Sequence, residues 1–281
     1  TEEDVAGIKR EFSLALLKRS SLWWFDMWGG FYQEPVLFEN FRLMKEIYDS
    51  RIRLPSRNVE EVAMIVDPDA LAYFDQRSPR QRDFQPDIRK KLNRLGAPFE
   101  TWCLRDVPSI PNLHEIKFFI FATPWEITPE KAELLNRHVL NHDRTVLWFY
   151  APGISDGKSF DESRIRRWTG ADPHVSGLSV QRMNGWTSAF LRNPAELTPA
   201  TLKSLAKSAG VHLYSDAEIP VYADDRFLAL HSKEGGTMTI RLPRRTGRIT
   251  ELFSGKLAAE NVSEFQWNFR APDTVLFEME D

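Results

Sequence analysis

Hydrophobic and polar positions in the first fifth of the chain predict a helix, a strand and a second helix. Within residues 3–19 the apolar side chains recur every three or four positions, which is the spacing of one helical face. The short apolar run 22–26 predicts a strand, the glycine pair after it indicates a loop, and residues 36–50 repeat the helical spacing. This order is the repeat unit of an α/β barrel, but so few elements cannot close one. Residues 1–55 therefore either pack on the rest of a larger protein or bury the apolar strand against the domains that follow.

Short apolar runs alternate with amphipathic segments from residue 56 to residue 217. Such alternation favours a parallel sheet covered by helices on both faces, the doubly wound α/β fold. Thr128 and Pro129 provide an N-cap and a first-turn proline for one of the helices. Strands are predicted at 61–67, 99–104, 117–123 and 145–150, helices at 86–95, 129–141, 160–168 and 198–209, and a short strand at 178–183 in a less regular stretch.

The helical period disappears in the last part of the chain, where short strands recur between turns. This pattern predicts a small antiparallel β-domain. Gly235-Gly236 lies between two alternating runs and predicts a hairpin that joins them. The predicted domains are therefore residues 1–55, 56–217 and 218–281.

Composition narrows the classes of function. The chain has 281 residues and a net charge of -3, which disfavours nucleic acid or an acidic membrane as a partner. No apolar run approaches the roughly 20 residues of a membrane span, so a soluble protein is expected. The single Cys103 excludes an internal disulfide and favours the cytoplasm without fixing the compartment. Because the chain begins at Thr1 and not at a methionine, a signal peptide cannot be tested.

Several runs resemble one enzyme family. WWFDMWGGFYQEP at 23–35 is similar to the last strand and loop of the catalytic TIM barrel in β-galactosidase-like glycoside hydrolases related to family 42. VAMIVDPDALAYF, LNRLGAPFETWCLRDV, KFFIFATPWEITPEKAELL and TVLWFYAPG resemble the flavodoxin-like, class I glutamine-amidotransferase-like trimerisation domain of those enzymes. PVYADDRFLALHSKEGGTMTIRLP, followed by TELFSG, resembles their small C-terminal β-domain.

This resemblance implies the C-terminal portion of a retaining glycosidase that acts on a galactoside-like carbohydrate. In that family the acid/base and the nucleophile are glutamates at the ends of the fourth and seventh barrel strands, so both are expected upstream of this chain. No catalytic residue is therefore assigned here. The resemblance also implies a homo-oligomer, trimer or dimer, contact with the upstream barrel of the same polypeptide, and no cofactor.

Four residues are the candidates for contact with substrate. Trp24, Asp26, Trp28 and Tyr32 lie at the end of the presumed barrel strand or in the loop after it, the region that forms the active-site face of such barrels. Alternation along a strand places the first three on one face and Trp23 on the other. A tryptophan here can stack on a sugar ring, and the aspartate can bind hydroxyls or orient a catalytic glutamate. The alternative is that the aromatic residues fill a core and the aspartate caps a loop.

Other candidate groups have plainer interpretations. A retaining glycosidase needs two carboxyl groups about 5–5.5 Å apart, but Glu34, Asp67 and Asp69 read as loop or helix-start acids. Cys103 lies between large residues and not on a tight elbow, which indicates a buried structural thiol and loss of amidotransferase chemistry. His138 and His142 share a helical spacing without an evident third ligand, so no metal site is assigned.

A second class of function stays open, a free-standing flavodoxin-like binding or interaction protein without chemistry. Residues 20–50 discriminate the two, because an apolar aromatic strand has a natural place in a barrel and none in a self-contained flavodoxin-like protein. The glycosidase interpretation is favoured.

Overall fold

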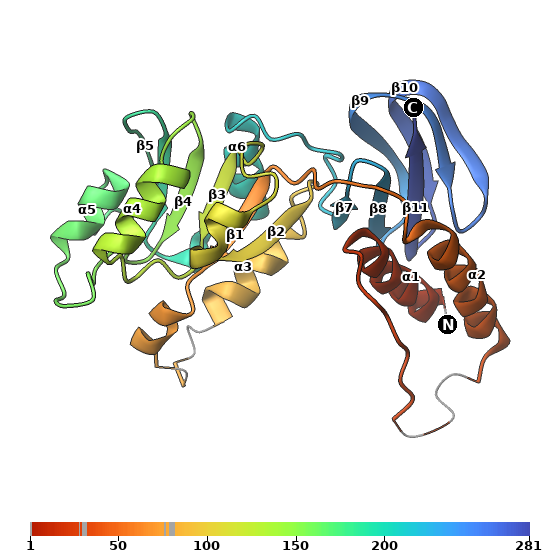
Figure 1. Cartoon of the computed structure of the whole chain (residues 1–281), viewed down its shortest axis with the longest axis horizontal. Helices are drawn as coiled ribbons and strands as arrows, with labels where there is room; N and C mark the ends of the chain where they lie inside the picture. Colours follow the sequence, from red (N-terminus) through yellow and green to blue (C-terminus); the bar gives the residue numbers. More distant parts are fainter. Residues whose placement is uncertain (1, 28, 30–32, 76, 79–81) are drawn as a thin grey trace. The chain divides into compact units, whose positions relative to one another are not determined.

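The computed structural model describes residues 2–27, 29, 33–75, 77–78 and 82–281. The chain forms two compact units (Figure 1). We call residues 60–95 and 99–212 the α/β unit, and residues 1–59, 96–98 and 213–281 the β unit. No helix of the described part is long and apolar enough to cross a bilayer.

The α/β unit is built on a six-stranded sheet with the order β2-β1-β3-β4-β6-β5. Five strands are parallel, and β5 runs antiparallel to β6 at the edge. The sequence predicts the first four strands and β5, but it gives no separate signal for β6, whose Thr-Ser-Ala start is less apolar than the other runs. The strands are β1 (Val62–Val66), β2 (Phe99–Cys103), β3 (Phe118–Phe121), β4 (Thr145–Phe149), β5 (Leu178–Arg182) and β6 (Thr187–Leu191).

The central strands are covered on both faces. All residues of β3 and β4 are buried, and successive side chains of a strand point to opposite faces. Phe119, Phe121 and Trp148 lie in one core cluster with Leu135 and Ile165 of two covering helices. The continuous apolar runs of the sequence follow from this two-sided burial.

Helices connect the strands as the alternating pattern predicts. Thr128 caps its helix by accepting a hydrogen bond from the backbone N–H of Lys131 at 3.3 Å, and Pro129 occupies the first turn. Thr198 caps another helix in the same way through Thr201 N–H at 3.0 Å. The helices are α3 (Gln85–Leu92), α4 (Pro129–His138), α5 (Ser163–Thr169) and α6 (Pro199–Ser208), and 3₁₀ segments span η1 (Asp69–Tyr73), η3 (Leu104–Ser109) and η4 (Pro194–Glu196).

The β unit holds a five-stranded antiparallel sheet with the order β10-β9-β11-β8-β7, which confirms the predicted antiparallel β-domain. The hairpin predicted at Gly235-Gly236 is wrong, because β11 lies between β8 and β9. Two of the predicted short runs merge into the single long strand β9. The strands are β7 (Val221–Ala223), β8 (Phe227–Ser232), β9 (Gly236–Glu251), β10 (Lys256–Phe269) and β11 (Asp273–Glu280).

Two N-terminal helices, α1 (Glu2–Leu17) and α2 (Pro35–Arg51), pack on one face of this sheet (Figure 1). Phe12 and Leu16 of α1 share a core cluster with Ile47 of α2 and with Phe227 and Leu276 of the sheet. The sequence pattern separates residues 1–55 from 218–281, whereas in the structure the two segments bury their apolar faces against each other. Leu228, Val275 and Phe277 belong to a second core cluster, which they share with Ile240 of β9 and Phe265 of β10.

Candidate functional site

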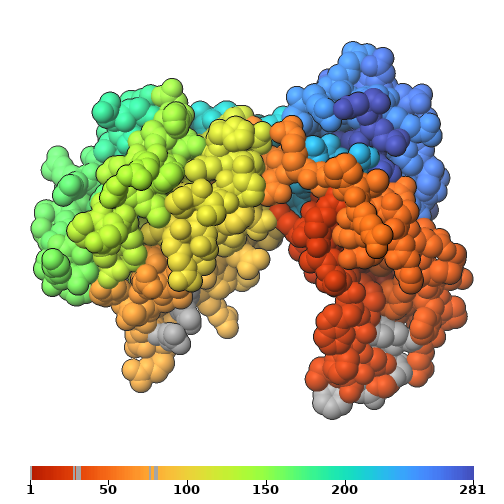
Figure 2. Space-filling model, viewed as in Figure 1, coloured from red at the N-terminus to blue at the C-terminus, as the bar shows by residue number. Residues whose placement is uncertain are grey.

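The segment that follows α1 carries the site predicted from the sequence. Residues 20–27 are extended but form no strand, so the strand predicted from Leu22 to Asp26 is wrong for this structure. An extended segment becomes a strand only by hydrogen bonding to a neighbouring strand. No strand among the described residues pairs with residues 20–27. Figure 2 shows this segment projecting from one end of the β unit.

Side chains of this segment alternate in exposure. Trp23, Phe25 and Met27 are 72%, 59% and 65% exposed, whereas Trp24 and Asp26 between them are half-buried. Trp23 and Phe25 lie edge to face with ring centroids 5.2 Å apart. The segment therefore has one face directed to the β unit and one apolar face directed outward.

The inward face holds the two candidate residues that the structure describes. The Trp24 indole stacks on Phe41 of α2 at 5.2 Å and 29°, and it packs against the α1/α2 core. Oδ1 of Asp26 accepts a hydrogen bond from the backbone N–H of Gly29 at 2.9 Å. These contacts are those of a packed aromatic ring and a loop cap. Trp28 and Tyr32 lie outside the described residues, and a role of the four in binding sugar stays a prediction.

A second polar site lies in the α/β unit where strands β1 and β3 end. Strand order reverses at this point, and ligands of open α/β sheets bind in the crevice outside such strand ends. Lys131 Nζ, in the first turn of α4, lies 2.7 Å from Asp67 Oδ2, 2.7 Å from Glu126 Oε1 and 3.5 Å from Asp69 Oδ2. The Tyr73 hydroxyl donates to Glu126 Oε2. Asp67, Asp69 and Lys131 also line a pocket of about 190 Å³.

The ionisation of this cluster determines what it can do. Burial opposes the charge on Lys131, but hydrogen bonds to Asp67 and Glu126 outweigh burial and raise the pKa of the lysine. Hydrogen bonds from Lys131 and Tyr73 lower the pKa of Glu126. A lysine with a raised pKa is neither a nucleophile nor a general base at neutral pH, and its ammonium group donates to the carboxylates of Asp67 and Glu126. We conclude that the cluster joins β1, β3 and α4.

The lowered pKa of Glu126 predicts acid sensitivity of the α/β unit. A carboxylate with a depressed folded pKa adds stability above its unfolded pKa, about 4.3, and this stability is lost as the pH falls through the folded value. Glu126→Gln is therefore expected to lose less unfolding free energy than the wild type between pH 6 and pH 3. Urea unfolding across that range measures the difference. Glu133→Gln, on the exposed face of α4, is the control, and equal pH slopes for wild type and Glu126→Gln would contradict the interpretation.

The sequence missed most of this cluster. Asp67 and Asp69 are singled out because they follow a strand, but Lys131 reads as a surface lysine of an amphipathic helix and Glu126 as a loop acid. A usable signal is the Thr128-Pro129 cap, because it places Lys131 one turn into a helix that starts beside the carboxyl ends of the parallel strands.

The structure also places the remaining candidates, Cys103, His138 and His142. Cys103 ends β2 and is half-buried, not fully buried as expected. His138 is the last residue of α4, and His142 lies beyond it with a φ of 55°, so the two do not share a helical face. Within the described residues, no group of three His, Cys, Asp or Glu side chains is placed to hold a metal ion.

The fold of this chain matches part of the solved structures of β-galactosidases of glycoside hydrolase family 42. This match confirms the resemblance at the level of the fold. The β-galactosidase from Bacillus circulans sp. alkalophilus matches 89% of this chain with a TM-score of 0.64 and 14% identity. A catalytic mutant of a family 42 β-galactosidase from G. stearothermophilus matches 89% with a TM-score of 0.60 and 12% identity. The β-galactosidase from Rahnella sp. R3 matches 88% with a TM-score of 0.57 and 11% identity.

The matched region is a part of those enzymes. This chain spans 46%, 44% and 45% of the three chains, which is about half of their length. No protein-family model matches the sequence, and no curated protein is similar to it at a significant level.

Proposed function

We propose that this chain is the C-terminal portion of a β-galactosidase-like glycoside hydrolase that cleaves O-glycosidic bonds with retention. The observation that carries the proposal is the fold match, which covers 89% of the chain and includes both units. The two catalytic glutamates belong to a barrel segment that precedes residue 1 in the natural polypeptide. This chain then contributes part of the active-site wall and the accessory domains, with a galactoside-like carbohydrate as substrate.

The exposed apolar face of residues 22–27 supports a barrel partner. Large contiguous apolar patches on a folded protein mark interaction sites, and another protein surface is one of the partners that cover them. Trp23, Phe25 and Met27 present apolar side chains to solvent on a segment that is neither helix nor strand. In our proposal this segment is the last strand of the TIM barrel, and pairing with neighbouring barrel strands completes it. Trp24, Asp26, Trp28 and Tyr32 then stand at the rim of the active site.

The α/β unit is assigned the assembly role in this proposal. Its strand order, with β1 and β3 at the centre and β2 outside β1, agrees with the 2-1-3-4-5 order of flavodoxin-like sheets if β6 is taken as the fifth strand. This order supports a flavodoxin-like, amidotransferase-like domain. Loss of amidotransferase chemistry is supported by Cys103, which lies between Trp102 and Leu104 with no neighbouring glycine to form a tight elbow. We propose that this unit mediates a homotrimer or homodimer.

The reading frame upstream of residue 1 and the activity of its product test the proposal. The natural polypeptide is expected to encode a barrel with two glutamates and to cleave nitrophenyl β-galactosides, whereas residues 1–281 alone are expected to be inactive. In the full-length protein, Asp26→Asn should lower kcat/KM by roughly tenfold, or about 1.4 kcal/mol of transition-state stabilisation. Asp49→Asn, an exposed aspartate on α2, is the matched control.

Two results would overturn the proposal. One is an upstream frame without such a barrel, which would favour the free-standing interaction protein. The other is turnover by residues 1–281 alone that survives loss of both Asp26 and Glu34, because the catalytic carboxylates would then lie within this chain.

A further inference from the structure

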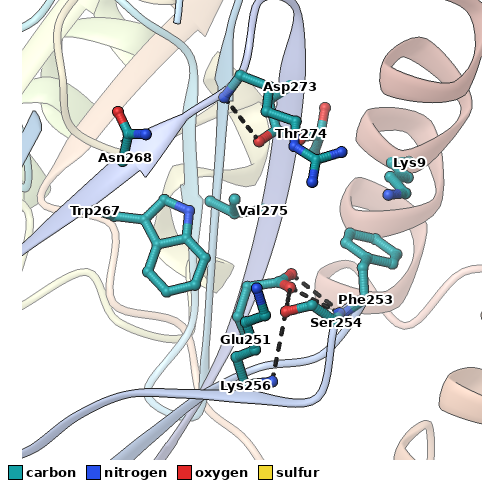
Figure 3. A pocket seen from close by; sticks show the side chains of 11 residues that line it. Lys9, Glu251, Phe253, Ser254, Lys256, Trp267, Asn268, Asp273, Thr274 and Val275 are labelled. Carbon is teal, nitrogen blue, oxygen red and sulfur yellow. Dashed lines mark hydrogen bonds between the residues drawn. The ribbon is translucent and has the colours of Figure 1, made fainter. Parts of the chain in front are cut away.

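A pocket of about 460 Å³ lies in the β unit, and residues 20–27 do not line it. The proposed function gives this pocket no role. It is lined by residues of β9, β10 and β11, by residues of the turns that join these strands, and by Lys9 on α1. Figure 3 shows Trp267 and Phe253 on opposite sides of the pocket, with Val275 between them. Glu251, Ser254 and Lys256 lie at one end, and Asp273 and Thr274 lie at the other. A space of this size is typical of a site for a small ligand.

The aromatic side chains give the pocket apolar walls. Trp267 is half-buried and held at an angle of 85° to Phe277, with ring centroids 5.2 Å apart. Phe253 is held in the same way by Phe12, at 6.1 Å and 60°. Packing of this kind fixes ring orientation while each ring still lines the pocket. A fixed indole is a platform on which the C–H face of a pyranose ring can lie flat.

The polar lining holds three cations, Lys9, Lys256 and Arg270, and two carboxylates, Glu251 and Asp273. Both oxygens of Glu251 are already used, because they accept from the N–H groups of Phe253, Ser254 and Leu276 and from the Ser254 hydroxyl. The Thr274 hydroxyl donates to Ala6 O. By contrast, the three cations Lys9, Lys256 and Arg270 have no carboxylate of the described residues within salt-bridge distance. The Lys9 Nζ lies 4.8 Å from the centre of the Phe253 ring.

These cations stand at different ends of the pocket. Lys256 lies beside Glu251 at one end of the pocket, and Asp273 lies at the other end. Oδ2 of Asp273 accepts a hydrogen bond from the backbone N–H of Arg270 at 3.2 Å. A single phosphate or sulfate ion needs donors that converge on one point. Cations that are spread along an aromatic-walled pocket instead suit a longer ligand with ring faces and more than one acidic group.

We propose that this pocket binds an acidic oligosaccharide, one whose pyranose rings carry carboxylate or sulfate groups. One ring stacks on Trp267. Arg270 and Lys256 bind acidic groups at the two ends, and the guanidinium of Arg270 has the fork geometry that carboxylates and sulfates accept. The Asn268 amide supplies a further polar contact beside the indole. This site is separate from the cleavage site of the proposed function and does not depend on it.

Isothermal titration of residues 1–281 with trigalacturonate tests the proposal. We expect a Kd of roughly 1 mM or below, at least tenfold weaker binding of neutral galactotriose, and weakening at high salt. Trp267→Ala and Arg270→Gln should each weaken binding by about tenfold or more, while Trp267→Phe should retain most of the affinity. Arg245→Gln, an exposed arginine of β9 outside the pocket, is the charge control and should bind like the wild type.

Several outcomes would overturn the site. They are no heat of binding at about 10 mM trigalacturonate, equal affinity for the neutral trisaccharide, wild-type affinity of Trp267→Ala, or binding of inorganic sulfate as tight as that of trigalacturonate. Circular dichroism of each variant separates loss of binding from loss of fold. Galactoside hydrolysis by the full-length protein should be unchanged by Arg270→Gln, so failure of the pocket proposal and failure of the hydrolase proposal are distinguishable.

Discussion

Replacement of Lys131 by methionine is expected to lower the unfolding free energy of the α/β unit by about 3–5 kcal/mol. Its side chain is 16% exposed, and it is the cation between Asp67 and Glu126, whose side chains are 5% and 13% exposed. Loss of the ammonium leaves the carboxyl groups of Asp67 and Glu126 without their shared cation in a site with little water. Urea unfolding followed by tryptophan fluorescence measures the effect, because five of the nine tryptophans belong to this unit.

Two companion variants make the Lys131 result specific. Lys90→Met on α3 removes an exposed lysine that pairs with Asp87, and it should cost no more than about 1 kcal/mol. Adding Asp67→Asn and Glu126→Gln to Lys131→Met should recover part of the loss, because the uncompensated charges are then gone. A Lys131→Met protein within about 1 kcal/mol of the wild type would show that the cluster does not hold the strand ends together.

Replacement of Arg144 by methionine is expected to cost about 2–4 kcal/mol. Arg144 is 5% exposed, and burial lowers the pKa of its guanidinium. It donates to the carbonyl oxygens of Ile116 at 3.0 Å and Leu113 at 2.7 Å, and to that of His138 at the end of α4. The guanidinium thus satisfies three backbone carbonyls from the loop before β3 and from α4, and methionine satisfies none.

Chemical denaturation with two comparison variants checks the Arg144 prediction. Arg144→Lys should lose an intermediate amount of unfolding free energy. One ammonium group does not reproduce the planar fork that reaches both the loop before β3 and the end of α4. Arg137→Met removes an exposed arginine of α4 that pairs with Glu133, and it should stay within about 0.5 kcal/mol of the wild type. If Arg144→Met unfolds at the same denaturant concentration as Arg137→Met, the carbonyl contacts contribute nothing to stability.

Local patterns in the sequence predict much of the α/β unit. The runs that become β1, β3 and β4 are continuously apolar because both of their faces are buried, and this signal is independent of distant contacts. Thr128-Pro129 starts α4 by capping chemistry that operates within four residues. The antiparallel direction of β5 cannot be predicted from its own sequence, because it depends on the strand with which this segment pairs at the edge of the sheet.

Errors arise where pairing involves segments far apart in the chain. Gly235 and Gly236 do turn the chain, but β11 takes the place beside β8 that a hairpin would give to β9. The run at 22–26 has the composition of a strand without a paired neighbour in the described structure. The Lys131 cluster likewise joins residues 64 positions apart, and nothing in the local sequence of either Lys131 or Asp67 announces the other.

Contact between α1 and β11 sets the order in which this protein can fold during synthesis. The Thr274 hydroxyl binds the carbonyl of Ala6, so the first helix meets a strand made 268 residues later. At about 5–20 residues per second, the ribosome completes residues 60–212 before most of the sheet that covers α1 and α2 exists. At these rates the two helices are made about 10–45 seconds before the sheet is complete, and during this interval their apolar faces lack the strands that cover them in the folded protein.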